Sequence, residues 1–351
     1  AFLSYLVLYA GFGYDPFYFH MFSLLLHIGC VCLVWKLISS LLRVHGGVSE
    51  KQILYVNFIT TLLFAVHPIN VEAVAWISAL KVLLYAFFYL LGLLCYLRYI
   101  RTSKIFYYVL TIGCFLCSFW GKEQAVTFPL ALLIVDWFTN RNMKNLEVWS
   151  EKMSFLIMAF FFGIITVLSQ GKGPYEMIFP LYQRLLFGCF ALVEYITKSL
   201  LPVNLNFFYP FPIVLGEEPP LHYYLYPVVL LFLMGWIIAY RNNRYLVFGV
   251  LLFLVNLLFS IHLFNMSRHA IVADRYMYLS YVGIAFLIAN GIWWLRKRLS
   301  YFKAALVFLF FYCFFLSVYT FHYTKKWENT TMVKKYTKEV LEKRLNGSNH
   351  L

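Results

Sequence analysis

Long apolar runs recur from one end of the chain to the other, and this pattern restricts the fold more than any other feature. Phe17–Leu42 and Ala79–Ile100 are two such runs, and each holds few charged residues. A helix of about 20 apolar residues is long enough to cross the hydrocarbon core of a bilayer. Because 62% of the 351 residues are hydrophobic and only 13% are charged, a soluble domain would lack the interior to bury them. The sequence therefore predicts an integral membrane protein.

The expected fold is an all-α, polytopic membrane protein with about nine to ten transmembrane helices. Ala1–Tyr14 is apolar but irregular, and we expect it at the membrane interface. The predicted spans are Phe17–Leu42, Gln52–Val66, Ala79–Ile100, Ile105–Trp120, Ala125–Phe138, Met153–Leu168, Tyr226–Tyr240, Tyr245–Ile261, Tyr276–Leu295 and Ala304–Tyr319.

Clusters of lysine and arginine indicate how these helices are oriented, because cytoplasmic loops carry an excess of basic residues. The clusters share one side only if Leu185–Leu201 does not cross the membrane. Its Glu194 and Lys198, four residues apart, also fit lipid poorly. We therefore predict that Leu185–Leu201 is re-entrant or interfacial. The clusters then placed in the cytoplasm are Arg98–Lys104, Arg141–Lys152, Arg241–Arg244 and Arg296–Lys303.

Three other features of the sequence have ordinary structural explanations. The net charge of +14 does not indicate nucleic-acid binding, because most basic residues lie in short loops between apolar runs. Cys114 and Cys117 form a CxxC pair inside an apolar run, where packing is the expected role rather than a metal or redox centre. His20 and His27 share a helix face, and we expect buried, hydrogen-bonded histidines there rather than metal ligands.

The polar loop His67–Lys81 interrupts two long apolar runs and is the main site candidate. Pro68 suits the first turn of a helix, where its missing N–H has no cost. On such a helix Glu72 and Trp76 are four residues apart and share a face. Ionisable groups next to hydrocarbon are costly, so a histidine, a glutamate and a lysine in this loop indicate a functional site.

Lys122 and Glu123 follow the end of another span. They have two interpretations that the sequence leaves open. In the first, the two side chains form a structural ion pair. In the second, the lysine acts as a point charge that contacts the phosphate of a lipid ligand.

Asp274, Arg275 and Tyr276 open a later helix. An aspartate in a first helical turn is stabilised by the helix dipole, so Asp274 has a sufficient structural explanation. Arg275 is harder to explain in this way, because a guanidinium at a membrane boundary needs a carboxylate or phosphate partner. This argues for a functional use of Arg275.

The predicted topology brings these three loops to the same outer face of the membrane. Cations there can hold a phosphate leaving group, while a carboxylate can accept a proton from an acceptor hydroxyl. A transporter more typically places its charges at mid-span, next to broken helices. Charges at the rim therefore favour chemistry on a lipid-borne substrate.

Four ordered motifs resemble those of one enzyme family, the transmembrane and tetratricopeptide-repeat O-mannosyltransferases and their bacterial relatives. The resemblance covers nearly the whole chain. The motifs are His67-Pro-x-x-x-Glu-Ala-Val-Ala-Trp, Lys122-Glu-x-Ala-Val-Thr-x-Pro-Leu, Tyr195-Ile-Thr-Lys-Ser-Leu-Leu-Pro-x-Asn-Leu and Ala273-Asp-Arg-Tyr-x-Tyr-Leu.

The resemblance implies an inverting glycosyltransferase of the GT-C class, with a GT-C-like bundle of helices. Such an enzyme moves a sugar, expected to be mannose, from a polyprenyl phosphate such as dolichyl-phosphate mannose to Ser or Thr of a protein. No redox cofactor is implied, and a need for divalent metal is left open. The implied partners are membrane lipid, the lipid-linked donor and an acceptor protein. The implied location is the endoplasmic reticulum membrane in a eukaryote or the inner membrane in a bacterium.

The resemblance also suggests roles for individual residues. Lys81, Lys122 and Arg275 would contact the lipid phosphate, while His67 and Glu72 would contact the sugar or the acceptor. The family's main catalytic base is expected in an outer loop upstream of this chain. The full set of binding candidates is His67, Trp76, Lys81, Lys122, Glu123, Arg275 and Tyr276, and the catalytic candidates are Glu72 and Asp274.

Two alternatives to an enzyme remain: a non-catalytic membrane scaffold or lipid-binding subunit of the same fold and, with less support, a transporter. Residues 1–321 are expected to form the transmembrane core and residues 322–351 an outer tail. Met332–Leu345 is rich in lysine and predicts a soluble helix. Asn-x-Ser/Thr triplets at Asn265, Asn329 and Asn346 fall on the outer side, where glycosylation is allowed.

Overall fold

The computed structural model describes residues 2–169, 179–262 and 270–348. Within these ranges the regular structure is helical, apart from one isolated β-bridge between Tyr209 and Val272. This confirms the expectation of an all-α protein. Asn265 lies outside the described residues.

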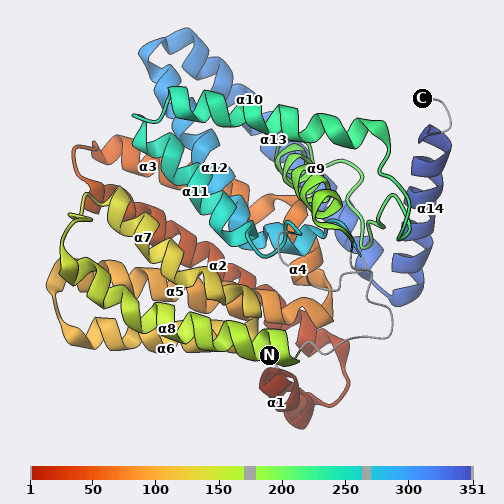
Figure 1. The fold of residues 1–351 in the computed structure, drawn as a ribbon, viewed down its shortest axis with the longest axis horizontal. Coiled ribbons are helices and arrows are strands. Elements are labelled where there is room, and N and C mark those ends of the chain that lie inside the picture. The colour runs from red at the N-terminus through yellow and green to blue at the C-terminus, as the bar shows by residue number, and fades with distance from the viewer. Residues whose placement is uncertain (1, 170–178, 263–269, 349–351) are drawn as a thin grey trace.

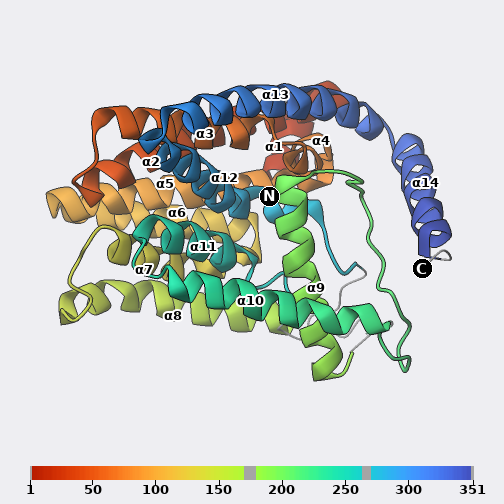
Figure 2. The ribbon, with the colours of Figure 1, turned by 90° about the horizontal axis from the view of Figure 1, so that it is seen from above.

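Most of the helices run roughly side by side along the long axis of the molecule (Figures 1 and 2). Helix α5 lies at the centre of this bundle and buries Tyr85, Tyr89 and Tyr96. The bundle helices are α2 (Pro16–His45), α3 (Glu50–Val66), α5 (Leu80–Thr102), α6 (Ile105–Gly121), α7 (Phe128–Phe138), α8 (Leu146–Ser169), α10 (Leu225–Ala239), α11 (Arg244–Leu257), α12 (Met277–Trp294) and α13 (Leu299–Thr324).

Six helices of the described chain are long and apolar enough to cross a membrane, and a seventh span is formed if α3 and the bent segment after it count as one. The polytopic membrane fold is therefore confirmed. The predicted number of nine to ten spans is reached only when shorter apolar helices also cross. These are α6, α11 and α1 (Phe2–Phe12), the last of which falls in the segment expected at the membrane interface.

The basic linkers gather at one end of the bundle, at the left in Figure 1. The linkers that meet there are those between α2 and α3, α5 and α6, α7 and α8, α10 and α11, and α12 and α13. Helix α9 (Leu181–Leu200) lies steeply across α8 and α10 in Figure 2 and is absent from the helices that could span a membrane. The gathering of the basic linkers at one end agrees with their predicted common side, and the re-entrant or interfacial placement of α9 stays a prediction.

A close approach between α5 and α6 fixes the position of the second site loop. A Cβ atom on Gly121 would come within 2.6 Å of the backbone nitrogen of Tyr85, so only glycine fits there. Lys122 follows this contact directly, and its backbone N–H still donates to Ser118. The glycine therefore holds Lys122 beside α5.

The chain after residue 321 continues the helix α13 to Thr324 and then forms α14 (Thr330–Ser348). The side chain of Asn329 caps α14 by accepting a hydrogen bond from Met332 N. A small apolar cluster of Val71, Leu205, Tyr323 and Trp327 packs this region against the loop after α3. The predicted helix at Met332–Leu345 is confirmed, while the division into core and tail stays a prediction.

Candidate functional site

The loop His67–Lys81 folds into three short helical turns, because its polar residues satisfy the backbone where α3 ends. These turns are η1 (Pro68–Asn70), α4 (Val71–Ala75) and η2 (Ile77–Ala79). The ring Nδ1 of His67 accepts a hydrogen bond from Ile69 N, and the Asn70 amide donates to Phe64 O. The chain bends by 50° at this break.

Glu72 and Arg275 form a buried ion pair that joins the first loop to the third. Glu72 is 0% exposed, and its Oε1 lies 2.5 Å from Nη1 of Arg275. The backbone N–H of Arg275 donates to Oε2 at 2.6 Å. Charge-assisted hydrogen bonds of this kind are about twice as strong as neutral ones. The carboxylate therefore fixes both the guanidinium and the backbone of η5 (Asp274–Tyr276).

Aromatic rings surround the cations of the site. The guanidinium carbon of Arg275 lies 5.3 Å from the ring centroid of Trp76 and 5.2 Å from that of Tyr276. The ammonium of Lys122, which is buried, lies 4.4 Å from the same Tyr276 ring. The sequence predicted that Glu72 and Trp76 share a helix face, but α4 ends at Ala75 and Trp76 follows it in an extended conformation. Both side chains nevertheless contact Arg275. The three loops thus converge, and Tyr276 contacts both cations.

Asp274 lies in a second buried network that the sequence analysis did not find. The hydroxyl of Tyr209 lies 3.0 and 2.9 Å from the two carboxylate oxygens, and Lys198 donates to that hydroxyl at 2.8 Å. Burial raises the pKa of Tyr209 well above its usual value, so the phenol stays protonated and donates to Asp274. Glu194 lies 3.6 Å from Lys198, as its i,i+4 spacing predicted.

Two of the predicted binding residues lie apart from the ion pair. Lys81 is exposed and Glu123 is half-buried. Across the described ranges, no hydrogen bond or ion pair joins either side chain to Glu72 or Arg275. Their roles stay predictions.

Two hollows flank α4 at the end of the bundle that carries the site. The tail-side hollow, of about 940 Å³, is lined by Trp76, Phe207, Trp327, Asn329, Thr330 and Lys334, among others. The membrane-side hollow, of about 840 Å³, is lined by residues that include Leu24, His67, Asn70, Val74, Ser317 and Phe321. Arg275 and Lys122 line neither hollow.

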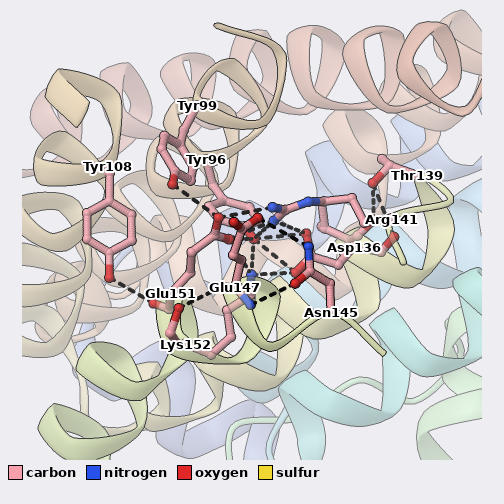
Figure 3. Close-up of polar contacts among 12 residues, drawn as sticks. Tyr96, Tyr99, Tyr108, Asp136, Thr139, Arg141, Asn145, Glu147, Glu151 and Lys152 are labelled. Carbon is pink, nitrogen blue, oxygen red and sulfur yellow. Dashed lines mark hydrogen bonds and ion pairs between the residues drawn. The ribbon is translucent and has the colours of Figure 1, made fainter. Parts of the chain in front are cut away.

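A third polar cluster lies at the opposite end of the bundle, where Arg141, Glu151 and Lys152 meet Asp136 and Tyr96 (Figure 3). Arg141 binds Glu151 through two hydrogen bonds of 2.7 and 3.0 Å, and these raise its pKa above the usual value. The ammonium of Lys152 contacts Asp136, Glu151 and the Tyr96 hydroxyl. Each charge has an opposite partner, so the cluster joins α5, α7 and α8 as a structural unit.

The described residues contain no group of three or more His, Cys, Asp or Glu side chains arranged to hold a metal ion. The site therefore consists of paired charges and aromatic rings. His27 is hydrogen-bonded to the Tyr278 hydroxyl at 2.7 Å and to Ala65 O at 3.3 Å, which confirms the predicted hydrogen bonding of His27. The same expectation for His20 stays a prediction.

Comparison with known proteins finds similarity to a set of protein O-mannosyl-transferases. The chain is 33% identical over 153 residues to Protein O-mannosyl-transferase TMTC2 of Homo sapiens, which covers 42% of this chain and 17% of that protein. It is 29% identical over 177 residues to Protein O-mannosyl-transferase tmtc2 of Xenopus laevis, covering 48% and 20%. It is 28% identical over 153 residues to Protein O-mannosyl-transferase Tmtc3 of Drosophila melanogaster, covering 38% and 16%.

The matched segment therefore spans no more than about a fifth of the length of these relatives. No family model matches the chain, and no solved structure matches it. The resemblance that the four motifs indicated is confirmed by relatives whose names all describe protein O-mannosyl-transferases.

Proposed function

We propose, from the kinship of this chain with the protein O-mannosyl-transferases, that it forms the membrane part of an enzyme that transfers mannose to protein. The observation that carries the proposal is the convergence of three loops that are far apart in sequence: Glu72 pairs with Arg275, and Lys122 lies over the adjacent Tyr276 ring. Two cations, Lys122 and Arg275, meet there at the end of the bundle opposite the basic linkers. A pair of cations is suited to a phosphate leaving group.

The proposed donor is a polyprenyl-phosphate sugar, and the proposed acceptor is a Ser or Thr hydroxyl of a protein. Basic loops face the cytoplasm, so the site lies at the outer or luminal face. In a eukaryote the proposed location is the endoplasmic reticulum membrane. Lys122 and Arg275 would stabilise the negative charge that develops on the phosphate as the sugar leaves.

Both buried carboxylates of the site act, in this proposal, by positioning their neighbours. Both oxygens of Glu72 are occupied by Arg275, and both oxygens of Asp274 lie within hydrogen-bond distance of the Tyr209 hydroxyl. Glu72 orients the guanidinium, and Asp274 holds the turn that carries it.

The test is mannose transfer by the full-length protein in membranes after Arg275→Ala. We expect transfer to fall by about a hundredfold, which is the usual effect of removing one electrostatic donor to a transition state. The matched control is Arg244→Ala, because Arg244 stacks on Trp137 at 5.0 Å at the other end of the bundle. Equal transfer by both variants, at equal expression, contradicts the assigned site.

One observation favours the alternative of a non-catalytic scaffold or lipid-binding subunit. Glu72 and Arg275 satisfy each other, so the pair also serves as a structural link between α4 and η5. A folded, full-length protein that binds polyprenyl-phosphate mannose and transfers none of it would support this alternative. Retention of transfer after Arg244→Ala and its loss after Arg275→Ala would support the enzyme.

A further inference from the structure

The membrane-side hollow is lined by two polar side chains, each of which makes one hydrogen bond and leaves a second hydrogen-bonding atom without a partner among the described residues. It lies between the start of α2, the break after α3 and the last turns of α13, and its volume is about 840 Å³. His67 and Asn70 line it, at 1% and 3% exposure. Buried polar groups without a partner cost about 1 to 3 kcal/mol each, so a pair of them at one hollow requires an explanation.

The free atom of His67 is a donor. Its Nδ1 accepts from the backbone N–H of Ile69 at 3.2 Å, so Nδ1 carries no proton and the neutral ring carries its proton on Nε2. The backbone of Ser199 approaches the ring. Even so, Nε2 makes no hydrogen bond of normal geometry with any described residue.

The free atom of Asn70 is an acceptor. Its amide NH₂ donates to Phe64 O at 2.7 Å, which fixes the orientation of the amide, because a carbonyl oxygen can only accept. The other end of the amide, Oδ1, has no hydrogen-bond partner among the described residues. The two residues are three apart around the turn η1, where Asn70 N donates to His67 O.

One unused donor and one unused acceptor, on two residues that line the same hollow, complement a hydroxyl group, which accepts one hydrogen bond and donates another. We propose that the membrane-side hollow binds a lipid that carries a hydroxyl, and that His67 Nε2–H and Asn70 Oδ1 hold this hydroxyl. An anionic group fits less well, because the Asn70 oxygen would repel it.

The walls of the hollow indicate that its ligand comes from the bilayer. Leu24 of α2 and Phe321 of α13 are 50% and 62% exposed, and both helices are long and apolar enough to span a membrane. Val74 of α4 adds a third apolar side chain. The identification of this hydroxyl with the sugar of a polyprenyl-phosphate mannose rests on the proposed function. The binding of a hydroxyl by His67 and Asn70, which we call the hydroxyl pair, does not rest on it.

The test is equilibrium binding of labelled polyprenyl-phosphate mannose to the full-length protein in nanodiscs, with sugar-free polyprenyl phosphate as the competitor. We expect the wild type to prefer the mannosyl lipid by about 5- to 30-fold, as one or two net hydrogen bonds allow. His67→Phe keeps an aromatic ring beside Tyr281, and Asn70→Leu keeps the volume of the amide. Each variant should lose most of the preference. A variant that binds both lipids equally well remains folded, so a purely structural role cannot explain this result.

A matched pair of variants tests the location independently of His67 and Asn70. Ser317 lines the hollow, whereas its exposed neighbour Val318 does not. Ser317→Phe should weaken binding of the mannosyl lipid by at least fivefold, and Val318→Phe should leave it unchanged. Equal binding by the two variants overturns the assignment of the hollow.

The remaining outcomes separate this inference from the proposed function. Unchanged preference for the mannosyl lipid in both His67→Phe and Asn70→Leu overturns the hydroxyl pair. If a sterol competes in the wild type and loses its effect in these variants, the hydroxyl pair stands and the mannosyl lipid is the wrong ligand. If His67→Phe and Asn70→Leu lose the preference for the mannosyl lipid while the wild type transfers no mannose, the hydroxyl pair is supported and the enzyme is contradicted.

Discussion

The side chains of Lys152 and Asp136 form an ion pair, 2.5 Å long, from which solvent is wholly excluded. The two residues come from α8 and α7, on either side of a short loop. Removing one member of such a pair leaves an uncompensated buried charge and costs about 3–5 kcal/mol. We therefore expect Asp136→Ala to lower the thermal unfolding midpoint of the purified protein in detergent strongly.

Two controls separate the buried charge from a general effect of the substitution. The double variant Asp136→Leu with Lys152→Met removes both charges, and it should recover a large part of the lost stability. Glu342→Ala removes an exposed i,i+4 partner of Lys338 and should change the free energy of unfolding by less than about 0.5 kcal/mol. If Asp136→Ala were as mild as Glu342→Ala, the buried pair would not stabilise the fold.

Gly121 allows the next test, because α5 and α6 touch at this residue. An added Cβ would meet the Tyr85 backbone at 2.6 Å, so Gly121→Ala must push the helices apart. We expect a loss of about 1–3 kcal/mol and a lower mannose transfer, because Lys122 moves with the helix end. Gly113→Ala on the same helix meets nothing within 4 Å and should be neutral or slightly stabilising. A similar loss in both variants would mean that space at Gly121 is not the cause.

The hydroxyl of Tyr209 links Lys198 to Asp274, and its removal is the third prediction. Tyr209→Phe leaves a buried ammonium and a buried carboxylate without their shared partner. The expected cost is about 1–3 kcal/mol, measured as a lower unfolding midpoint. Tyr182→Phe is the control, because Tyr182 is exposed and bonds the exposed Glu218. Similar midpoints for the two variants would contradict a role for the network in holding η5.

The sequence predicted the features that depend on local pattern. Run length and composition gave the helices, and the i,i+4 spacing of Glu194 and Lys198 marked α9 as unsuited to lipid. The convergence of Glu72 and Arg275 was expected only as a shared membrane face. Their direct contact, across 203 positions, was not foreseen, because periodicity carries no information on which loops meet in space.

The residues that were missed form partnerships across long distances in the chain. Tyr209 contacts Asp274 from 65 positions away, and Tyr96 contacts Asp136 from 40. Both tyrosines occur in segments full of aromatic residues, so nothing local distinguished them. The sequence predicted only that Asp136 lies near one end of the span Ala125–Phe138 and that Lys152 belongs to the cytoplasmic cluster that follows it. Only the packing of α7 on α8 shows that the two side chains bury each other.

The orientation of the site depends on α9, and this gives the final prediction. If α9 does not cross the membrane, the α5–α6 and α10–α11 linkers lie on one side and the start of α14 on the other (Figure 1). Single cysteines at three exposed positions, Lys104→Cys, Asn242→Cys and Thr330→Cys, report this after the native cysteines are replaced. An impermeant maleimide added to sealed membranes whose outer or luminal face is exposed should label only Thr330→Cys. Labelling of Asn242→Cys but not of Thr330→Cys would show that α9 crosses, and Arg275 would then lie at the cytoplasmic face, where an outer or luminal transfer reaction could not use it.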